Sequence, residues 1–200
     1  NMDLSNSYLK SIEPLKSLTK LQTLNLSNNN FNLKLQVLEL SELSEIKTLH
    51  KLNLSNNYIY NLDSLKPNSN IEKLNLADNQ LKSLRFLNNF PNLDSLDMSR
   101  NQLVSLNTLP KCDKLVTLNL RGNPLNDIGK LNQLKNLEVL NLSGINQNVW
   151  QLPKMNNLVE LRMSGSQKLV KNLNQNDVMY KRLQLLDISQ NNITKLHISK

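Results

Sequence analysis

Leucine recurs at a fixed spacing along the chain, within the pattern L-x-x-L-x-L-x-x-N, in which Ile or Met replaces Leu in some copies. The eight longer copies begin at Leu21, Leu49, Ile71, Leu93, Leu115, Leu137, Leu158 and Leu183. A clipped copy, MDLSNS, opens the chain at Met2. Successive longer copies start 28, 22, 22, 22, 22, 21 and 25 residues apart. Four equal steps in a row indicate an internal repeat of the length found in solenoids.

Each repeat predicts one short strand and one return segment. The central L-x-L alternates with period two, which is typical of a strand. In the copy that starts at Leu93, the later apolar residues Leu103, Leu106 and Leu109 fall at every third position, which suits 3₁₀ turns or extended segments. One coil cannot bury its own Leu face, so neighbouring coils must stack. The sequence therefore predicts an α/β solenoid: a curved arc with a concave parallel sheet and convex 3₁₀ or short helical segments.

The turn residues support the same fold. All six prolines lie outside the L-x-L segments, where they would remove a ladder hydrogen bond. Gly122, Gly144 and Gly165 share one place just after the strand, where the backbone must turn sharply. The Asn at position 9 carries a donor and an acceptor, so it can bridge backbone groups of adjacent coils. We expect such a ladder at Asn29, Asn57, Asn79, Asn101, Asn123 and Asn191.

At these residues the chain resembles the leucine-rich repeat proteins. Its 22-residue repeat, with apolar residues also at positions 11, 14, 17 and 20, is similar to one class of that family. The class includes the leucine-rich regulatory subunit of protein phosphatase 1, the leucine-rich light chain of outer-arm dynein and the bacterial internalins. The resemblance implies a curved solenoid and protein recognition as its usual task, without naming a partner. We expect one domain over residues 1–200, with about nine strands, incomplete at both ends and part of a longer chain.

Three places depart from the repeat and are candidates for function, although drift without function explains them equally well. The copy from Leu21 is six residues longer than the others, and its spacing predicts a convex helix within residues 33–49. The copy from Leu137 has Ile145 in place of Asn, followed by Trp150, which we interpret as a packing residue. The copy from Leu158 has Ser166 in place of Asn and an insertion at residues 168–182.

The outward positions of the predicted strands form a polar face of mixed charge without aromatic residues. Tyr8, Tyr58 and Tyr60 follow strands on the loop edge, where they suit either protein contact or ordinary half-burial. Among these positions, Arg121 and Arg162 are of a type common at interface hot spots. The candidate partner-binding residues are Lys51, Asn53, Lys73, Asn75, Asp97, Asn119, Arg121, Arg162 and Asp187 on the concave side, with Tyr58 and Tyr60 at its edge.

Composition narrows the function classes. The formal net charge is +8, but the basic residues are interleaved with acidic ones, whereas nucleic-acid binding favours a stripe of one sign with stacking aromatics. No nucleophile signature, paired His, phosphate loop or metal-ligand spacing appears, so we expect no catalytic site, metal, cofactor or small-molecule substrate. The single Cys112 occupies an apolar position, which predicts an inert thiol. No apolar run is long enough to span a membrane.

These features leave three hypotheses in order. The first is a non-enzymatic protein-binding scaffold or assembly subunit inside the cell, since a lone cysteine favours a reducing compartment. The second is an extracellular or cell-surface recognition module of the internalin kind. Glycans on the N-x-S/T sites at Asn25, Asn53, Asn141 and Asn192 would support it, although the repeat itself generates three of those sites. The third is nucleic-acid binding. The oligomeric state, the partner and the source organism remain open.

Overall fold

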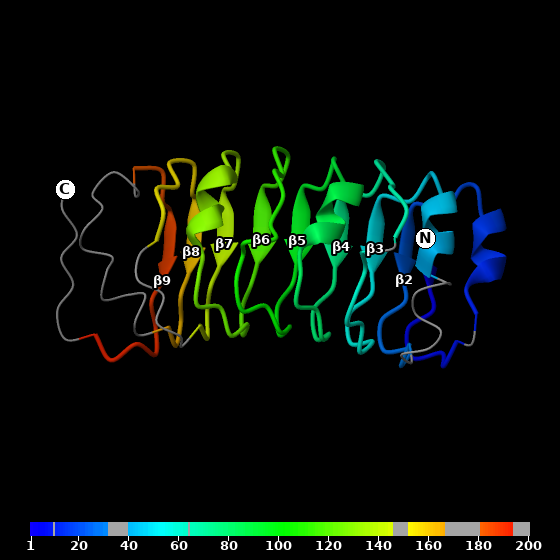
Figure 1. Ribbon diagram of the computed structural model, residues 1–200, viewed down its shortest axis with the longest axis horizontal. Helices are drawn as coiled ribbons and strands as arrows, with labels where there is room; N and C mark the ends of the chain where they lie inside the picture. The colour runs from blue at the N-terminus through cyan, green and yellow to red at the C-terminus, as the bar shows by residue number, and fades with distance from the viewer. Residues whose placement is uncertain (10, 32–39, 64, 146–151, 167–180, 194–200) are drawn as a thin grey trace.

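The repeats form one open sheet of nine parallel strands, arranged in sequence order. The computed structural model describes residues 1–9, 11–31, 40–63, 65–145, 152–166 and 181–193. The strands are β1 (Met2–Asp3), β2 (Thr23–Asn25), β3 (Lys51–Asn53), β4 (Lys73–Asn75), β5 (Ser95–Asp97), β6 (Thr117–Asn119), β7 (Val139–Asn141), β8 (Glu160–Arg162) and β9 (Leu185–Asp187). The predicted number of strands, their places and their parallel pairing are confirmed (Figure 1).

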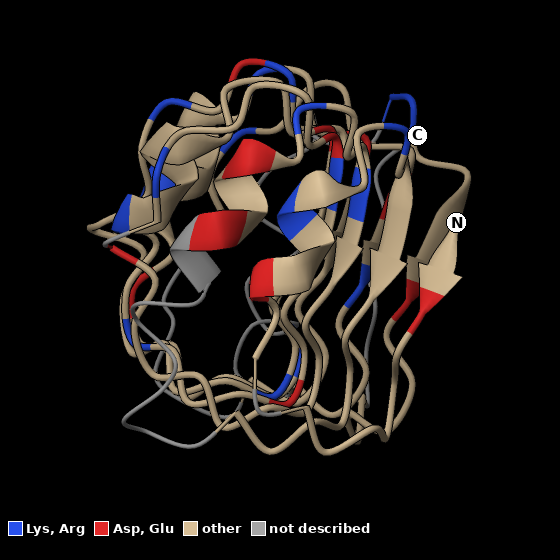
Figure 2. Ribbon diagram, turned by 90° about the vertical axis from the view of Figure 1, so that its right-hand side faces the viewer, with Lys and Arg blue, Asp and Glu red and all other residues tan. Residues whose placement is uncertain are grey.

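The register repeats from strand to strand. The central leucine of each strand pairs with the central leucine of the next, as Leu52 does with Leu74 and Leu74 with Leu96. Successive side chains of a strand point to opposite faces, so the leucines enter the coil while the residues on either side of them face outward. Seen along the stack, the strands line one side of the coil and the remaining segments return on the other side (Figure 2).

Short 3₁₀ helices occupy the return side, as the three-residue apolar spacing predicted. They are η1 (Glu13–Ser17), η2 (Leu40–Glu45), η3 (Arg85–Asn89) and η4 (Gly129–Gln133). The helix predicted within residues 33–49 is a 3₁₀ helix in its described part, because Leu43, Ile46 and Leu49 repeat every three residues and are all buried. Residues 32–39, with the apolar Leu35 and Leu38 of that prediction, lie outside the described residues.

The core is a continuous column of leucine side chains that runs through all the described coils. Within one repeat, Leu96, Met98, Leu103 and Leu106 are each at most 1% exposed. Full burial of one such side chain contributes about 1.5–3 kcal/mol. Cys112 packs against this core, and its burial, with a smaller effect of the Asp113 charge, raises the pKa of the thiol to about 11. This agrees with the expectation of an unreactive thiol.

A left-handed residue ends each strand at position 8. Its φ lies between 51° and 73° in all eight longer repeats, and Gly122, Gly144 and Gly165 occupy it where the sequence predicted a sharp turn. The remaining repeats place Asn28, Asn56, Asp78, Arg100 and Gln190 there. At Gly122 an added Cβ would also lie 3.2 Å from Cγ of Arg100 in the preceding repeat. Glycine at this position therefore serves both the turn and the close stacking of coils.

The predicted asparagine ladder is present. The Nδ2 of Asn101 donates to the carbonyl oxygen of Leu76 in the preceding repeat (2.8 Å) and of Met98 in its own repeat (3.1 Å), while its Oδ1 accepts from the N–H of Leu81 (3.0 Å). Equivalent carbonyl contacts recur at Asn29, Asn57, Asn79, Asn123 and Asn191. Each amide thus ties one coil to its neighbour through groups that the strand ladder leaves unpaired.

The ladder continues through one of the two places where the sequence lacks Asn. The Oγ of Ser166 donates to the Leu142 carbonyl (2.8 Å) and accepts from the N–H of Ile145 (3.1 Å), so a hydroxyl performs both tasks of the amide. The side chain of Ile145 is fully buried and joins the core instead. Trp150 and residues 167–180 of the predicted insertion lie outside the described residues.

A second set of amides stitches the opposite end of the coils, and our reading of the sequence missed it. Each of these asparagines precedes the first leucine of a repeat and donates from Nδ2 to a carbonyl oxygen of the preceding coil at 2.5–2.7 Å. They are Asn70, Asn92, Asn136 and Asn157. Their shared place in the repeat was the signal that could have revealed them.

Candidate functional site

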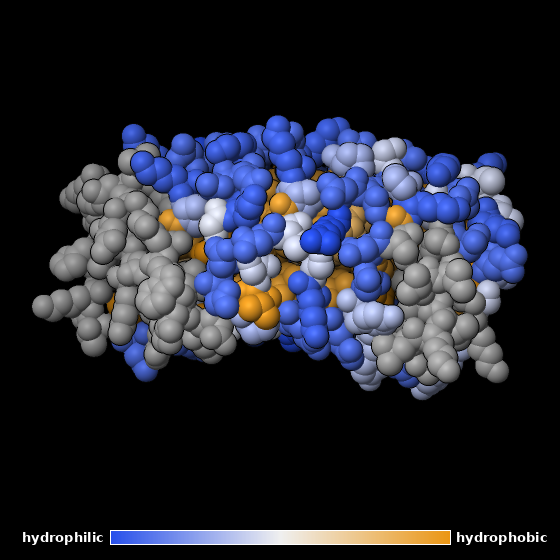
Figure 3. Space-filling model, in the orientation of Figure 1, coloured by the Kyte–Doolittle hydropathy of each residue, from blue (hydrophilic) through white to orange (hydrophobic). Residues whose placement is uncertain are grey.

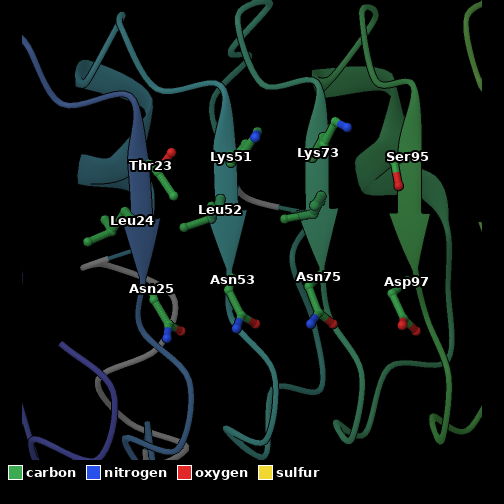
Figure 4. Close-up of a pocket in the computed structure, with 11 residues that line it drawn as sticks. Thr23, Leu24, Asn25, Lys51, Leu52, Asn53, Lys73, Asn75, Ser95 and Asp97 are labelled. Carbon is green, nitrogen blue, oxygen red and sulfur yellow. The ribbon is translucent and has the colours of Figure 1, made fainter. Parts of the chain in front are cut away.

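The concave face contains a groove over the first half of the sheet. The groove has a volume of about 360 Å³ and crosses strands β2 to β5 (Figure 4). Its walls are Thr23, Leu24, Asn25, Lys51, Leu52, Asn53, Lys73, Leu74, Asn75, Ser95 and Asp97. Five of the residues predicted to bind a partner, Lys51, Asn53, Lys73, Asn75 and Asp97, are therefore brought together in one depression.

The groove has two rows of polar side chains, one on each side of the leucine row. Thr23, Lys51, Lys73 and Ser95 form the upper row in Figure 4, and Asn25, Asn53, Asn75 and Asp97 form the lower row. Each row occupies a single position of the repeat, because the strands pair without a shift in register. The rigid repeat thus spaces like groups about 4.8 Å apart.

The lower row is held in place by its own backbone. The Oδ1 of Asn53 accepts from the N–H of Ser55 (3.0 Å), that of Asn75 from Ala77 (3.0 Å) and that of Asp97 from Ser99 (2.8 Å). The same contact two residues ahead recurs beyond the groove at Asn25, Asn119, Asn141 and Asp187. These contacts fix the rotamers before any partner arrives, a feature that strand periodicity does not reveal.

The other charged candidates on this face are partly neutralised. Arg162 on β8 pairs with Glu160 at 2.8 Å. On the turn after β5, the guanidinium of Arg100 makes a two-pronged contact with the carboxylate of Asp78, and this hydrogen bond is the main reason why the pKa of Arg100 is raised. The hydrogen bonds from Ser189 lower the pKa of Asp187 on β9.

The remaining predicted residues are spread around the groove rather than gathered in it. Asn119 and Arg121 belong to β6 and the turn after it, and Arg162 and Asp187 lie farther along the sheet. Tyr58 and Tyr60 follow β3 and are 53% and 43% exposed, but neither lines the groove. Tyr58 and Tyr8 also adopt positive φ (59° and 49°), which is costly for a bulky residue. Partner binding by all eleven candidates stays a prediction.

The return side differs from the concave face. Hydrophilic side chains cover most of the described surface there, and hydrophobic ones show between them along the middle of the solenoid (Figure 3). Within the part of the chain that the structure describes, no group of three or more His, Cys, Asp or Glu residues is placed to hold a metal ion. The helices described in the structure are all too short to cross a membrane.

Comparison with known proteins agrees with this geometry. The family model for leucine-rich repeats (two copies) matches residues 69–111. A search of curated proteins gives no match. Among solved structures, an internalin (inlF) of Listeria monocytogenes shares the fold with a TM-score of 0.65 and 22% identity, over 92% of this chain and 59% of the other.

Two further structures are more similar in sequence. A leucine-rich repeat protein of Leptospira interrogans has a TM-score of 0.69 and 25% identity, over 95% of this chain and 54% of the other. Internalin C2 of Listeria monocytogenes has a TM-score of 0.56 and 31% identity, over 66% of this chain and 56% of the other. The chain spans a little over half the length of these proteins. With its repeats, its single parallel sheet and these neighbours, the chain is a leucine-rich repeat protein that resembles the internalins.

Proposed function

We propose that the chain is a non-enzymatic protein-interaction module that binds a protein partner through its concave sheet and the loops beside it. The observation that carries this proposal is the sheet itself, whose outward side chains stand in rows at fixed spacing. The hydrogen bonds from Oδ1 of Asn53, Asn75 and Asp97 to their own backbone hold these rows in place. A preformed surface loses little conformational entropy when a partner binds.

The family assignment supports the same proposal. The leucine-rich repeat match and the likeness to internalins favour a recognition module over an enzyme. The stacked coils also give a broad surface of the kind that repeat proteins use for extended partners. Partner identity and cellular role are not specified by these likenesses, so the test must locate the contact surface directly.

Site-specific photo-crosslinking provides that test. A benzophenone amino acid is placed at Asn75 on the concave sheet, or at Lys130 in η4 on the return side, and each protein is irradiated in native extract. We expect protein adducts from position 75 that are absent from position 130. Adducts from position 130 alone, or turnover of a substrate in the absence of any protein adduct, would overturn the proposal.

The likeness to internalin C2 favours a second candidate that differs in compartment, a recognition module at or outside a bacterial cell surface. The lone cysteine favours the intracellular setting predicted from the sequence. Protease treatment of intact source cells separates the two. Loss of the protein under conditions that spare a cytoplasmic marker supports the surface module, and full protection supports the intracellular one.

A further inference from the structure

Two lysines stand side by side in the groove without an acidic partner. Lys51 on β3 and Lys73 on β4 are in register, so their backbones lie about 4.8 Å apart. Both side chains are exposed, and Figure 4 shows them leaving neighbouring strands in the same direction. Among the described residues, neither ammonium is within 4.0 Å of a carboxylate. Adjacent like charges destabilise a sheet, so this arrangement costs stability in the free protein.

The acids nearest to this pair along the sheet do not cancel it. Asp97 closes the far end of the groove on β5, but its Oδ1 accepts from the Ser99 N–H (2.8 Å) and its Oδ2 from Nδ2 of Asn119 (3.0 Å). Glu72 precedes Lys73 and is exposed without an ion pair among the described residues. By contrast, Arg162 on the same face is paired with Glu160.

The groups around the two lysines add further donors. The hydroxyls of Thr23 and Ser95 flank the lysines in the same row. Because the Oδ1 atoms of Asn53 and Asn75 already accept backbone hydrogen bonds, the Nδ2 groups are the part of these amides left for a partner. The groove therefore offers two cations, two amides and two hydroxyls, which together match carboxylate oxygens.

We propose that this lysine groove (Thr23, Lys51, Asn53, Lys73, Asn75 and Ser95) binds an extended acidic segment of a protein partner. The inference rests on the proposed function and names the chemistry of its partner. The four strands from β2 to β5 span about 14 Å, enough for roughly four residues of extended peptide. Carboxylates laid across the strands relieve the repulsion between the two ammonium groups.

Fluorescence anisotropy with a labelled peptide of about ten alternating Glu and Ser residues tests the inference. The double variant Lys51→Glu/Lys73→Glu is compared with Lys114→Glu/Lys130→Glu, whose exposed lysines lie outside the strands. Both variants change the net charge equally. We expect the groove variant to bind about tenfold more weakly and the control variant to bind within about twofold of the wild type. Lys51→Gln/Lys73→Gln gives an intermediate loss and guards against misfolding by charge reversal.

Three results would overturn the inference: no binding of the acidic peptide, equal weakening in both double variants, or equal binding of a Gln/Ser peptide. Tighter, Lys51- and Lys73-dependent binding of an oligouridylate of the same length would replace the acidic protein segment with nucleic acid. If the peptide fails while position 75 still crosslinks to a protein, the inference fails and the proposed function stands. If only position 130 crosslinks, the proposed function fails whatever the peptide does.

Discussion

Removal of one rung of the asparagine ladder has a cost that can be worked out contact by contact. Asn101→Ala deletes the Nδ2 contacts to Leu76, Met98 and Ser99 and the Oδ1 contact to the Leu81 N–H. The carbonyl of Leu76 keeps Asn79 Nδ2 (3.1 Å) and that of Met98 keeps Asn123 Nδ2 (2.8 Å). The Leu81 N–H loses its partner and stays buried, a loss of about 1–3 kcal/mol.

We therefore expect Asn101→Ala to lower the free energy of unfolding by about 2–3 kcal/mol, once the weakened carbonyl contacts are added. Asn101→Ser should recover part of the loss, because Ser166 shows that a hydroxyl can both donate to a carbonyl and accept from an N–H at this position. Asn107→Ala is the matched control, since Asn107 is exposed in the same repeat and should change stability by less than about 0.5 kcal/mol.

Urea unfolding followed by circular dichroism measures these differences, with the slope m compared among variants to detect a change in the unfolding mechanism. Indistinguishable midpoints for Asn101→Ala and Asn107→Ala at equal m would refute the ladder as a source of stability. A loss with Asn101→Ser as large as with Asn101→Ala would show that the contacts of Ser166 are not a substitute for the amide.

Three other changes follow from the same structure. Gly122→Ala should destabilise by about 1 kcal/mol in urea unfolding, because the backbone has φ +68° and the new Cβ meets Arg100, whereas Gly129→Ala, without positive φ, should cost less. The Cys112 thiol, with its pKa raised to about 11, should react slowly with a disulfide reagent at pH 8, and the stability that this group contributes should fall as the pH rises from 9 through 11; fast labelling of the folded protein at pH 8 would contradict this. Asp78→Asn should cost only about 0.2–1 kcal/mol and the cost should shrink in high salt, since its contact with Arg100 is exposed; a salt-independent loss would refute an electrostatic origin.

The repeat period explains why so much of the fold could be predicted. Leu52, Leu74 and Leu96 occupy one position of the pattern, so the strand, its inward face and its register follow from the sequence once coils are assumed to stack. Asn101 and Gly122 were predictable for the same reason, since only a few residue types satisfy an unpaired backbone group or a left-handed turn. The distinction between an α-helix and a 3₁₀ helix near Leu43 depended on local spacing and was missed.

The candidate site was less predictable because it depends on side-chain conformation. The pattern placed Lys51, Lys73 and Arg162 on one face, but it did not reveal that Arg162 is paired with Glu160 and that the two lysines have no acidic partner among the described residues. Nor did it show that Asn53 and Asn75 hold their own backbone through Oδ1. These facts depend on rotamers and on neighbours one strand away, which a single strand sequence does not encode.

Lysine footprinting of the chain in complex with its partner tests the central claim most directly. Brief acylation followed by mass spectrometry reports which ammonium groups the partner covers. The account predicts strong protection of Lys51 and Lys73 on the concave sheet and unchanged labelling of Lys114 and Lys130 outside it. Unchanged labelling of Lys51 and Lys73 with protection of Lys114 and Lys130 would contradict recognition through the concave face.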